Sequence, residues 1–219
     1  MTSATGAVWA VVVAAGSGSR FGGSKQFTVL GGARVVDRSL AVAREACDGV
    51  VLVLADTGGW DGPAVDAIVT GGATRAESVR AGLAEVPADA TVIVVHDAAR
   101  PLATGALYAA VVDAVRAGAD GALPGLPVAD TLKQVEDGVV VGTVARDALV
   151  AAQTPQAFRA GVLRAAHAAG DDATDDAALV EAAGGKVVVV PGDPLNLKLT
   201  SRRDLAVAEA LLASGGEDG

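Results

Sequence analysis

Aromatic side chains and cysteines are scarce in this sequence. Aromatic residues make up 3% of the 219 residues, whereas 51% are hydrophobic. The core must therefore be built from Val, Ala and Leu, which suits buried parallel strands covered by Ala-rich helices. Cys47 is the only cysteine, so an intrachain disulfide and a cysteine-based metal site are both excluded. We interpret Cys47 as a small buried side chain on a helix.

Long apolar runs and an excess of positive charge are also missing. No stretch approaches the ~20 apolar residues that a membrane span needs, and residues 1–6 lack the basic start and apolar stretch of a secretion signal. The formal net charge is −9, whereas a nucleic-acid binder normally carries a basic face. We therefore expect a cytoplasmic protein that binds neither membrane nor nucleic acid. A few cations can still gather around a small anionic ligand in one cleft.

Apolar runs alternate with segments of helical pattern along most of the chain. The pattern predicts strands at 9–14, 50–54, 68–70, 91–95, 121–123 and 187–190, and helices at 35–46, 75–84, 107–117 and 201–212. Thr104 is the expected N-cap of the third helix, and residues 201–204 resemble a capping box with Asp in place of Glu. Strands separated by helices need crossover connections, which give a parallel sheet with helices on both faces. The prediction is one doubly wound, mostly parallel α/β domain over residues 1–213, with a disordered tail at 214–219.

One segment, at about 128–146, breaks this alternation. Its pattern is strand, polar turn at Glu136-Asp137-Gly138, and strand again, with no room for a crossover helix. Asp-Gly between apolar residues is a hairpin signal. A two-stranded hairpin with exposed valines is marginal alone. We therefore expect a projecting β-hairpin arm that a partner subunit covers.

A glycine-rich segment directly follows the first predicted strand. It reads Ala-Ala-Gly-Ser-Gly-Ser-Arg over residues 14–20, and Lys25 comes shortly after. Doubly wound folds bind ligands at the carboxyl ends of their strands, and small residues let consecutive N–H groups approach phosphate oxygens. The spacing does not fit a Walker A motif, and Phe21 stands where a G-x-G-x-x-G pattern needs its third glycine. We therefore predict a triphosphate-binding loop rather than a turn without a ligand, with Arg20 and Lys25 supplying positive charge.

A second polar cluster ends the strand at 91–95, on the same rim as the loop. It reads His-Asp-Ala-Ala-Arg-Pro over residues 96–101. Asp97 is suited to hold a substrate hydroxyl or to help organise a metal ion, and Arg100 is suited to bind a phosphate. We interpret His96 as a packed strand-end histidine and His167 as a structural or exposed residue of an Ala-rich helix.

Further polar segments lie along the rest of the chain. Residues 71–78 read Gly-Gly-Ala-Thr-Arg-Ala-Glu-Ser, a glycine turn into a helix whose N–H groups and positive dipole end suit a ligand. The others are Asp130-Thr131-Leu132-Lys133 and Arg146 in the arm, Gln153-Thr154-Pro155-Gln156 after it, and Asn196-Leu197-Lys198 late in the chain.

Taken in this order, the segments resemble those of the 2-C-methyl-D-erythritol 4-phosphate cytidylyltransferase family of the non-mevalonate isoprenoid pathway. The resemblance covers about residues 10–208. The loop at 14–25 alone indicates only a nucleotidyltransferase, whereas the segments at 96–101, 130–133, 154–156 and 196–200 together are much more specific. The resemblance implies a Rossmann-like nucleotidyltransferase fold and transfer of CMP from CTP to a sugar-alcohol phosphate.

The resemblance also implies residue roles. Catalytic roles fall to Arg20, Lys25, Arg146 and Lys198. Contacts with CTP fall to Ala14, Ala15, Gly16, Gly18, Gly72, Ser78 and Ala98. Binding of the sugar-alcohol phosphate falls to Asp97, Arg100, Thr131 and Thr154. Arg146 would reach the site from the partner's arm in a homodimer, and Mg²⁺ would bridge the triphosphate oxygens, with Asp97 the one side chain considered for it.

Two positions depart from the family pattern. Ala73 stands where related enzymes often carry Asp beside the base, and Ser24 stands where they often carry Pro. Among the four lysines of the chain, Lys25, Lys133 and Lys198 fall in the motifs and Lys186 does not, which favours an anion-binding cleft in this acidic protein. Two alternatives stay open at this point: a ribitol-5-phosphate cytidylyltransferase, and a non-catalytic nucleotide-binding protein of the same fold.

Overall fold

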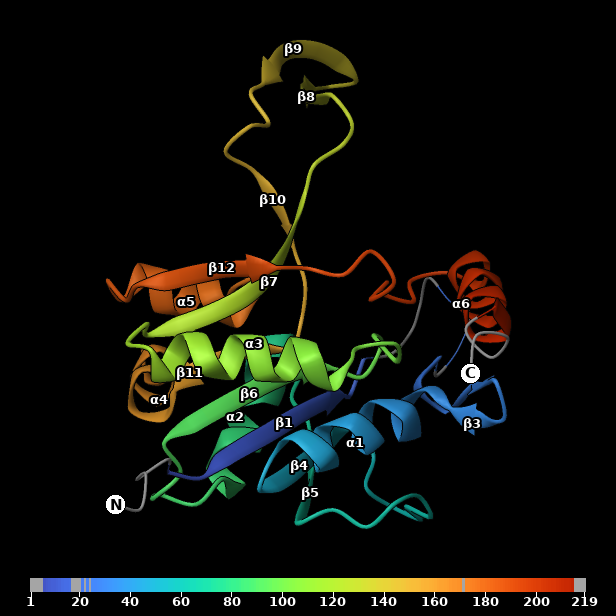
Figure 1. Cartoon of the computed structure of the whole chain (residues 1–219), viewed down its shortest axis with the longest axis vertical. Coiled ribbons are helices and arrows are strands. Elements are labelled where there is room, and N and C mark those ends of the chain that lie inside the picture. Colours follow the sequence, from blue (N-terminus) through green and yellow to red (C-terminus); the bar gives the residue numbers. More distant parts are fainter. Residues whose placement is uncertain (1–5, 17–20, 22, 24, 171, 215–219) are drawn as a thin grey trace.

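A mixed, mostly parallel sheet forms the centre of the protein (Figure 1). The computed structural model describes residues 6–16, 21, 23, 25–170 and 172–214. Within these residues the central sheet has eight strands: β1 (Val8–Ala14), β4 (Gly49–Leu54), β5 (Ala67–Thr70), β6 (Val92–Asp97), β7 (Gly121–Pro127), β10 (Val150–Ala152), β11 (Gln156–Arg159) and β12 (Val187–Pro191). Their order is β10-β7-β11-β6-β1-β4-β5, and β12 pairs with β7.

The parallel strands place their carboxyl ends on one rim. β1 runs parallel to β4 and β6, β4 runs parallel to β5, and β12 runs parallel to β7. β11 is antiparallel to both β6 and β7, so these two strands point the same way. In the register, Val13 of β1 lies beside Asp97 of β6 and Val53 of β4. The segments after Ala14 and around Asp97 therefore meet at the same edge.

Helices cover both faces of the sheet. The residues of α1 (Val35–Ala46) and α3 (Gly105–Arg116) belong to one hydrophobic core with alternate residues of β1, β4 and β6. Those of α2 (Arg75–Glu85), α4 (Ala160–Ala168) and α5 (Asp176–Ala182) share a second core with the opposite faces of the same strands. Every residue of β4 and β6 is buried, as expected for parallel strands covered on both sides.

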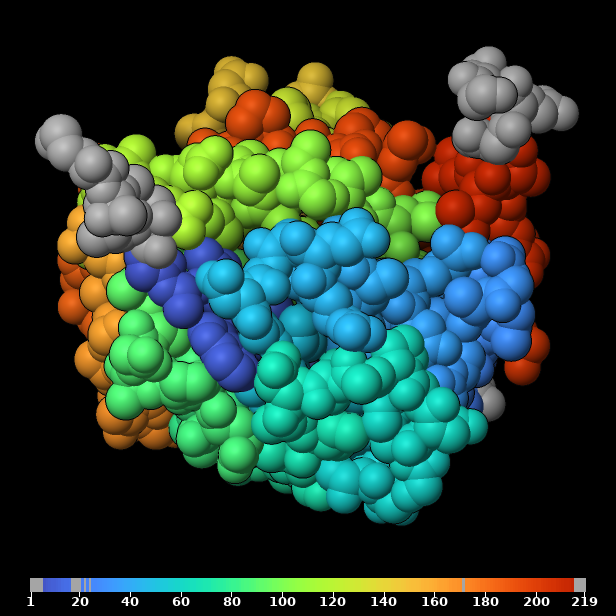
Figure 2. Space-filling model, turned by 60° about the horizontal axis from the view of Figure 1, so that its bottom comes forward, coloured from blue at the N-terminus to red at the C-terminus, as the bar shows by residue number. Residues whose placement is uncertain are grey.

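A smaller hydrophobic cluster attaches the last helix to the edge of the domain. η1 (Lys25–Phe27), β2 (Val29–Leu30) and β3 (Ala33–Arg34) follow the first loop, and Leu30 and Val35 pack with Leu199 and with Ala208 of α6 (Arg202–Ser214). Figure 2 shows α6 (red) against the blue segment that carries β2 and β3. This contact brings the chain around Lys198 back toward the first loop.

The predicted hairpin arm is present. β8 (Leu132–Glu136) and β9 (Val139–Val144) pair only with each other among the described strands and project from the sheet beyond β7 and β10 (Figure 1). Asp137 and Gly138 both have positive φ, at 47° and 81°, as a tight hairpin turn of the primed type requires.

The predicted fold class is confirmed, and several details differ. All six predicted strands and four predicted helices are present within a few residues of their expected bounds. α6 includes Ser214, which was expected to begin the tail. Cys47 is the half-buried C-cap residue of α1 rather than a buried helix residue. In the portion of the chain that the structure describes, no helix combines the length and apolarity needed to cross a membrane.

Candidate active site

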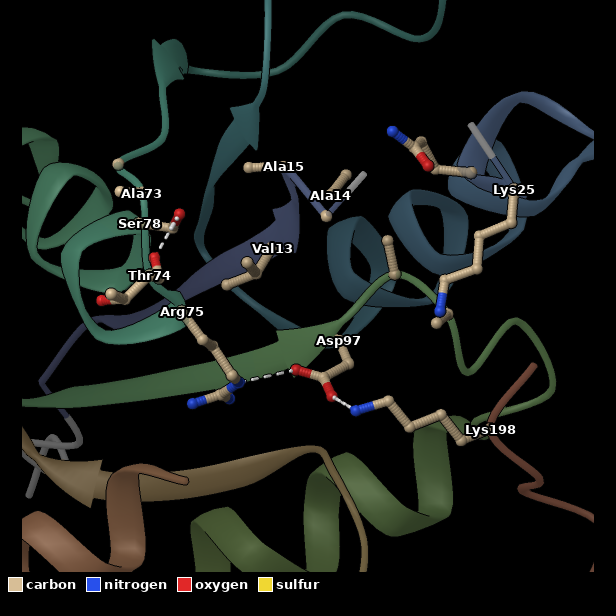
Figure 3. Close-up of a pocket in the computed structure, with 15 residues that line it drawn as sticks. Val13, Ala14, Ala15, Lys25, Ala73, Thr74, Arg75, Ser78, Asp97 and Lys198 are labelled. Carbon is tan, nitrogen blue, oxygen red and sulfur yellow. Dashed lines mark hydrogen bonds and ion pairs between the residues drawn. The ribbon is translucent and has the colours of Figure 1, made fainter. Parts of the chain in front are cut away.

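The site occupies the rim where β1 and β6 end. A cavity of about 390 Å³ opens there between the first loop and the start of α2 (Figure 3). Ala14, Ala15 and Gly16 form one wall, and Asp97, Ala98 and Ala99 form another. The remaining wall residues are Val13, Lys25, Gln26, Gly72, Ala73, Thr74, Arg75, Ser78 and Lys198. Seven of the residues that line this cavity are Gly or Ala, so a ligand can reach the backbone over much of the cavity surface.

The start of α2 is fixed by a capping box. The Thr74 hydroxyl accepts from the Glu77 N–H at 3.2 Å, and Glu77 Oε2 accepts from the N–H groups of Ala73 at 2.6 Å and Thr74 at 3.2 Å. The Ser78 hydroxyl donates to the Thr74 carbonyl at 2.9 Å. This rigid turn holds residues 72–74 against the cavity, and it consumes the backbone donor of Ala73.

Glycine is required at the turn before α2. A Cβ on Gly71 would lie 2.6 Å from the Ala15 Cβ and from the Ser78 Oγ, and a Cβ on Gly72 would lie 2.3 Å from the Glu77 Cβ. These glycines therefore permit a close approach between this turn, the first loop and α2.

Asp97 lies between two cations at the floor of the cavity. Its Oδ1 accepts from Arg75 Nε at 3.1 Å, and its Oδ2 accepts from Lys198 Nζ at 2.5 Å (Figure 3). Burial raises the pKa of Asp97, but the charges of Arg75 and Lys198 outweigh burial and hold that pKa well below its usual range. Asp97 is therefore an ionised carboxylate that fixes the Lys198 ammonium at the cavity floor.

A second cavity, of about 200 Å³, adjoins the first. Arg75, Asp97 and Lys198 line both cavities. The other lining residues of the second cavity are Arg100, Ala152, Gln153, Thr154, Gln156, Thr174 and Asp175. The Asp97–Lys198 pair thus stands where the two spaces meet, and a ligand in one cavity can approach a ligand in the other there.

His96 holds the residues around this junction through hydrogen bonds at both of its ring nitrogens. Its Nδ1 lies 3.2 Å from Thr154 Oγ1, and its Nε2 lies 3.2 Å from the Arg100 carbonyl oxygen. Thr154 Oγ1 accepts from the Asp97 N–H at 3.1 Å, so its own proton is directed to Nδ1, and the ring proton on Nε2 is donated to the carbonyl. Burial lowers the pKa of His96 to about 4. The prediction of a packed strand-end histidine agrees with this geometry.

Arg100 and Lys25 are both anchored to the C-terminal part of the chain. Arg100 donates to the carbonyls of Asn196 at 2.7 Å and Ala152 at 3.3 Å, and burial lowers its pKa. Lys25 Nζ donates to the Leu199 carbonyl at 2.9 Å. These contacts tie both cavities to residues 196–199, which also carry Lys198.

Most of the site residues expected from the sequence come together here. The first cavity collects Ala14, Ala15, Gly16, Lys25, Gly72, Ser78, Asp97, Ala98 and Lys198, and the second adds Arg100 and Thr154. Thr131 and Arg146 lie on the exposed arm and line neither cavity, and Arg146 donates to the Ala129 carbonyl there. Gly18 and Arg20 lie outside the described residues.

Sequence reasoning did not assign Arg75 or Thr174 to the site. Arg75 lies inside the 71–78 segment, but nothing in the sequence of that segment indicates that its side chain points to Asp97. Thr174 precedes Asp175, whose carboxylate caps α5 through the Ala178 N–H at 3.1 Å. A Thr-Asp-Asp sequence opening a helix was the available signal, and it lies on an element that the sequence pattern did not predict.

Asp97 does not fit the role of metal ligand that was considered for it. Both of its carboxylate oxygens already bind cations, and a divalent cation would be repelled by Arg75 and Lys198. No group of three or more His, Cys, Asp or Glu side chains suited to a metal ion occurs among the residues described.

Comparisons with known proteins agree on one family. The model of the 2-C-methyl-D-erythritol 4-phosphate cytidylyltransferase family matches residues 8–214. A protein of that name from Nocardia farcinica is 47% identical over 220 residues, which cover 94% of each chain. The bifunctional enzyme IspD/IspF of Clavibacter michiganensis is also 47% identical, and the aligned part covers 93% of this chain but 54% of that longer protein.

Solved structures give the same result. The crystal structure of 2-C-methyl-D-erythritol 4-phosphate cytidylyltransferase from Thermus thermophilus superposes with a TM-score of 0.80 at 35% identity, covering 93% of this chain and 98% of the other. A corresponding structure from Francisella tularensis also gives a TM-score of 0.80, at 26% identity over 92% of this chain.

Proposed function

Because the chain belongs to the 2-C-methyl-D-erythritol 4-phosphate cytidylyltransferase family, we propose that it transfers CMP from CTP to 2-C-methyl-D-erythritol 4-phosphate. The products are 4-diphosphocytidyl-2-C-methyl-D-erythritol and pyrophosphate. The observation that carries the proposal is the pair of adjoining cavities that share Asp97, Lys198 and Arg75. Two anionic substrates need adjacent spaces with positive charge at the junction.

The larger cavity is assigned to CTP. Ala14, Ala15 and Gly16 follow β1 and supply backbone N–H groups to the triphosphate, as glycine-rich loops at strand ends do. Lys25 adds a positive charge from η1 beside this wall. The turn before α2 and Ala98 then take the cytosine and ribose.

The smaller cavity is assigned to the alcohol phosphate. Arg100 and Thr154 line it, and Lys198 stands between it and the nucleotide. One phosphate oxygen of the acceptor attacks the α-phosphorus of CTP. The bond from that phosphorus to the bridging oxygen breaks, and pyrophosphate leaves with the bonding electrons. This displacement depends on alignment and charge neutralisation, which Lys25 and Lys198 supply.

We propose Mg²⁺ as the divalent cation of the reaction. It would be held by oxygens of the phosphorylated substrate and would neutralise part of the triphosphate charge. Asp97 instead remains paired with Arg75 and Lys198.

Base selection is assigned to backbone atoms in the turn at 71–73. Ala73 has no side-chain acceptor for the cytosine amino group, and its N–H is engaged by Glu77 at 2.6 Å. The carbonyl oxygens of this turn remain as acceptors for that amino group. Uracil presents an oxygen at the same position, so acceptor would face acceptor, and CTP is preferred.

The test is pyrophosphate release with CTP, UTP, ATP or GTP, each offered with 2-C-methyl-D-erythritol 4-phosphate or with ribitol 5-phosphate. We expect turnover with CTP and the methylerythritol phosphate, and a kcat/KM for CTP at least tenfold above that for UTP, or about 1.4 kcal/mol. Preference for ribitol 5-phosphate would indicate the related alcohol cytidylyltransferase. No pyrophosphate with any pair would indicate a nucleotide-binding protein without this activity.

A further inference from the structure

A chain of buried charged and polar side chains extends from the Asp97–Lys198 pair into the protein. Arg75 NH1 lies 2.8 Å from Asp176 Oδ2, and His167 Nε2 lies 2.9 Å from Asp176 Oδ1. Asp176 and His167 are almost completely buried, with side chains 1% and 2% exposed. Neither of them lines either cavity, so these two side chains do not contact a substrate bound there.

We propose that His167, Asp176 and Arg75 form a positioning chain that fixes the Asp97 carboxylate, and through it the Lys198 ammonium, at the junction of the two cavities. The inference rests on the proposed function, because it explains how one reactive cation is held between two substrates. The chain joins α4, α5, α2, β6 and the segment after β12, which are five separate parts of the fold.

The geometry of the guanidinium carries the argument. Arg75 Nε hydrogen-bonds to Asp97 Oδ1, and Arg75 NH1 forms an ion pair with Asp176 Oδ2. A planar group bound at two edges cannot rotate about its long axis without breaking one pair. The orientation of Asp97 Oδ1 is therefore set by Asp176, although Asp176 and Asp97 lie on different elements.

The charges of the chain also depend on one another. Burial disfavours the charge of Arg75, yet Asp176 and Asp97 together raise the pKa of the guanidinium above its ordinary value. Without Asp176, Arg75 would have Asp97 alone as a carboxylate partner among the described residues, and it would compete more strongly with Lys198 for that carboxylate. Both oxygens of Asp97 would then be drawn to Arg75, and Lys198 would be released.

His167 is the last member of the positioning chain, because its ring makes a single hydrogen bond among the described residues. The Nε2 proton is donated to Asp176, and Nδ1 is buried without a hydrogen-bond partner among the described residues. The ring therefore holds Asp176 Oδ1, and Oδ2, which has no hydrogen-bond partner among the described residues, is left to its ion pair with Arg75 NH1 at 2.8 Å. A glutamine at 167 can present an N–H donor to the same oxygen, whereas a leucine cannot.

The experiment compares Asp176→Asn, His167→Leu and His167→Gln with the unsubstituted protein. Arg164→Gln is the matched control, because Arg164 also lies on α4 and bonds the Val86 and Pro87 carbonyls without touching the chain. For each protein we would measure the unfolding temperature and the kcat and KM for CTP and for 2-C-methyl-D-erythritol 4-phosphate. Acetic anhydride labelling of Lys198, with the exposed Lys186 as internal reference, reports the position of the amine without requiring activity.

We expect Asp176→Asn and His167→Leu to lower kcat/KM for the alcohol phosphate at least tenfold, roughly what a small misplacement of a catalytic group costs. The KM for CTP should stay within about threefold, because Asp97 and Lys198 are only two of the residues that line the CTP cavity, and the first loop and the turn at 71–73 are left in place. The labelling rate of Lys198 relative to Lys186 should rise by about threefold or more as its ion pair loosens. His167→Gln should restore at least half of the lost efficiency, and Arg164→Gln should lower only the unfolding temperature.

Three outcomes would overturn the positioning chain. The first is unchanged labelling of Lys198 in folded Asp176→Asn and His167→Leu. The second is an equal loss in His167→Gln and His167→Leu, and the third is the same kinetic loss in Arg164→Gln. If Asp176→Asn does not fold, the two His167 variants decide. Absence of turnover by the unsubstituted protein would refute the proposed function, while the labelling ratios would still decide the positioning chain.

Discussion

At the scale of single residues, His96 connects the stability of the protein to the junction of its cavities. Its ring holds the Thr154 hydroxyl, and that hydroxyl holds the Asp97 backbone N–H. Both ring nitrogens are occupied in the neutral form. A second ring proton would oppose the proton that Thr154 directs at Nδ1. His96 is therefore a neutral hydrogen-bonding support, and it does not act as an acid or base near neutral pH.

This support makes stability sensitive to mild acid. The pKa of His96 is lowered from 6.5 to about 4 by burial, so in the unfolded chain the ring takes up a proton at a higher pH than in the folded protein. Its contribution is fully present above pH 6.5 and is lost as the pH falls toward 4. We expect the free energy of unfolding to fall by about 2 kcal/mol more in the unsubstituted protein than in His96→Gln between pH 7 and 4.5. Urea unfolding of both proteins at several pH values measures this difference, and parallel curves would contradict it.

The site could be predicted from the sequence only where its residues lie in recognisable motifs. Asp97, Lys25 and Lys198 were found in this way, because their segments match a family pattern. Arg75 and Asp176 were not assigned, since their meaning depends on a contact between α2 and α5. Such contacts between distant segments have no periodicity in the sequence. For the same reason, the sequence does not predict that Asp97 pairs with Arg75 and Lys198, the contacts that argue against Asp97 as a metal ligand.

At the scale of elements, the packing of α2 decides where Arg75 and the turn at 71–73 stand. Gly82 lets this helix approach the sheet closely, because a Cβ there would lie 2.5 Å from Val11 Cγ1 of β1 and 2.9 Å from Val53 Cγ2 of β4. Both valines are fully buried in the second core. The helix cannot retreat without moving the capping box at its start.

We therefore expect Gly82→Ala to destabilise the protein although alanine is the better helix former. The propensity gain is about 1 kcal/mol, whereas overpacking a core costs about 1–3 kcal/mol, so a net loss of about 1 kcal/mol follows. Gly161→Ala on α4 is the control, since nothing lies within 4 Å of its added Cβ, and it should be neutral or stabilising by about 0.5 kcal/mol. Denaturant midpoints of the two variants test this, and a Gly82→Ala protein as stable as Gly161→Ala would refute it.

The elements that the sequence pattern did not predict are short or fall outside the alternation of parallel strands and helices. β11 has four residues and runs antiparallel between β6 and β7, so it follows neither a crossover nor a hairpin signal. α5 has seven residues, too few for a helical period to be distinguished. The long buried runs of β1, β4 and β6 were predictable because both of their faces are covered.

At the scale of the whole molecule, the arm exposes apolar side chains that no other described part of the chain covers. Val139, Val140 and Val141 are successive residues of β9 and are 64%, 57% and 50% exposed. Successive strand residues point to opposite faces, so apolar side chains are exposed on both faces of the hairpin. Thr131 and Arg146, to which the resemblance gives a substrate-binding and a catalytic role, lie on this same arm. We propose a homodimer in which the partner covers the arm and in which Thr131 and Arg146 reach the partner's cavities.

A mixing experiment tests whether the site is shared between two chains. Lys25→Ala should lower turnover by ~10²–10³ through the loss of a contact with the triphosphate, and Arg146→Ala should also be nearly inactive. When the two variants are denatured together and refolded in equal amounts, half of the dimers pair one of each. In such a dimer, one site combines the intact Lys25 of one chain with the intact Arg146 of the other. Turnover should then recover to about a quarter of the unsubstituted value, because half of the dimers hold one working site of two. If Arg146 serves its own chain instead, no site in the mixture is intact. Turnover that stays at the level of the single variants, in samples where mass spectrometry shows mixed dimers, would therefore place Arg146 outside the partner's site.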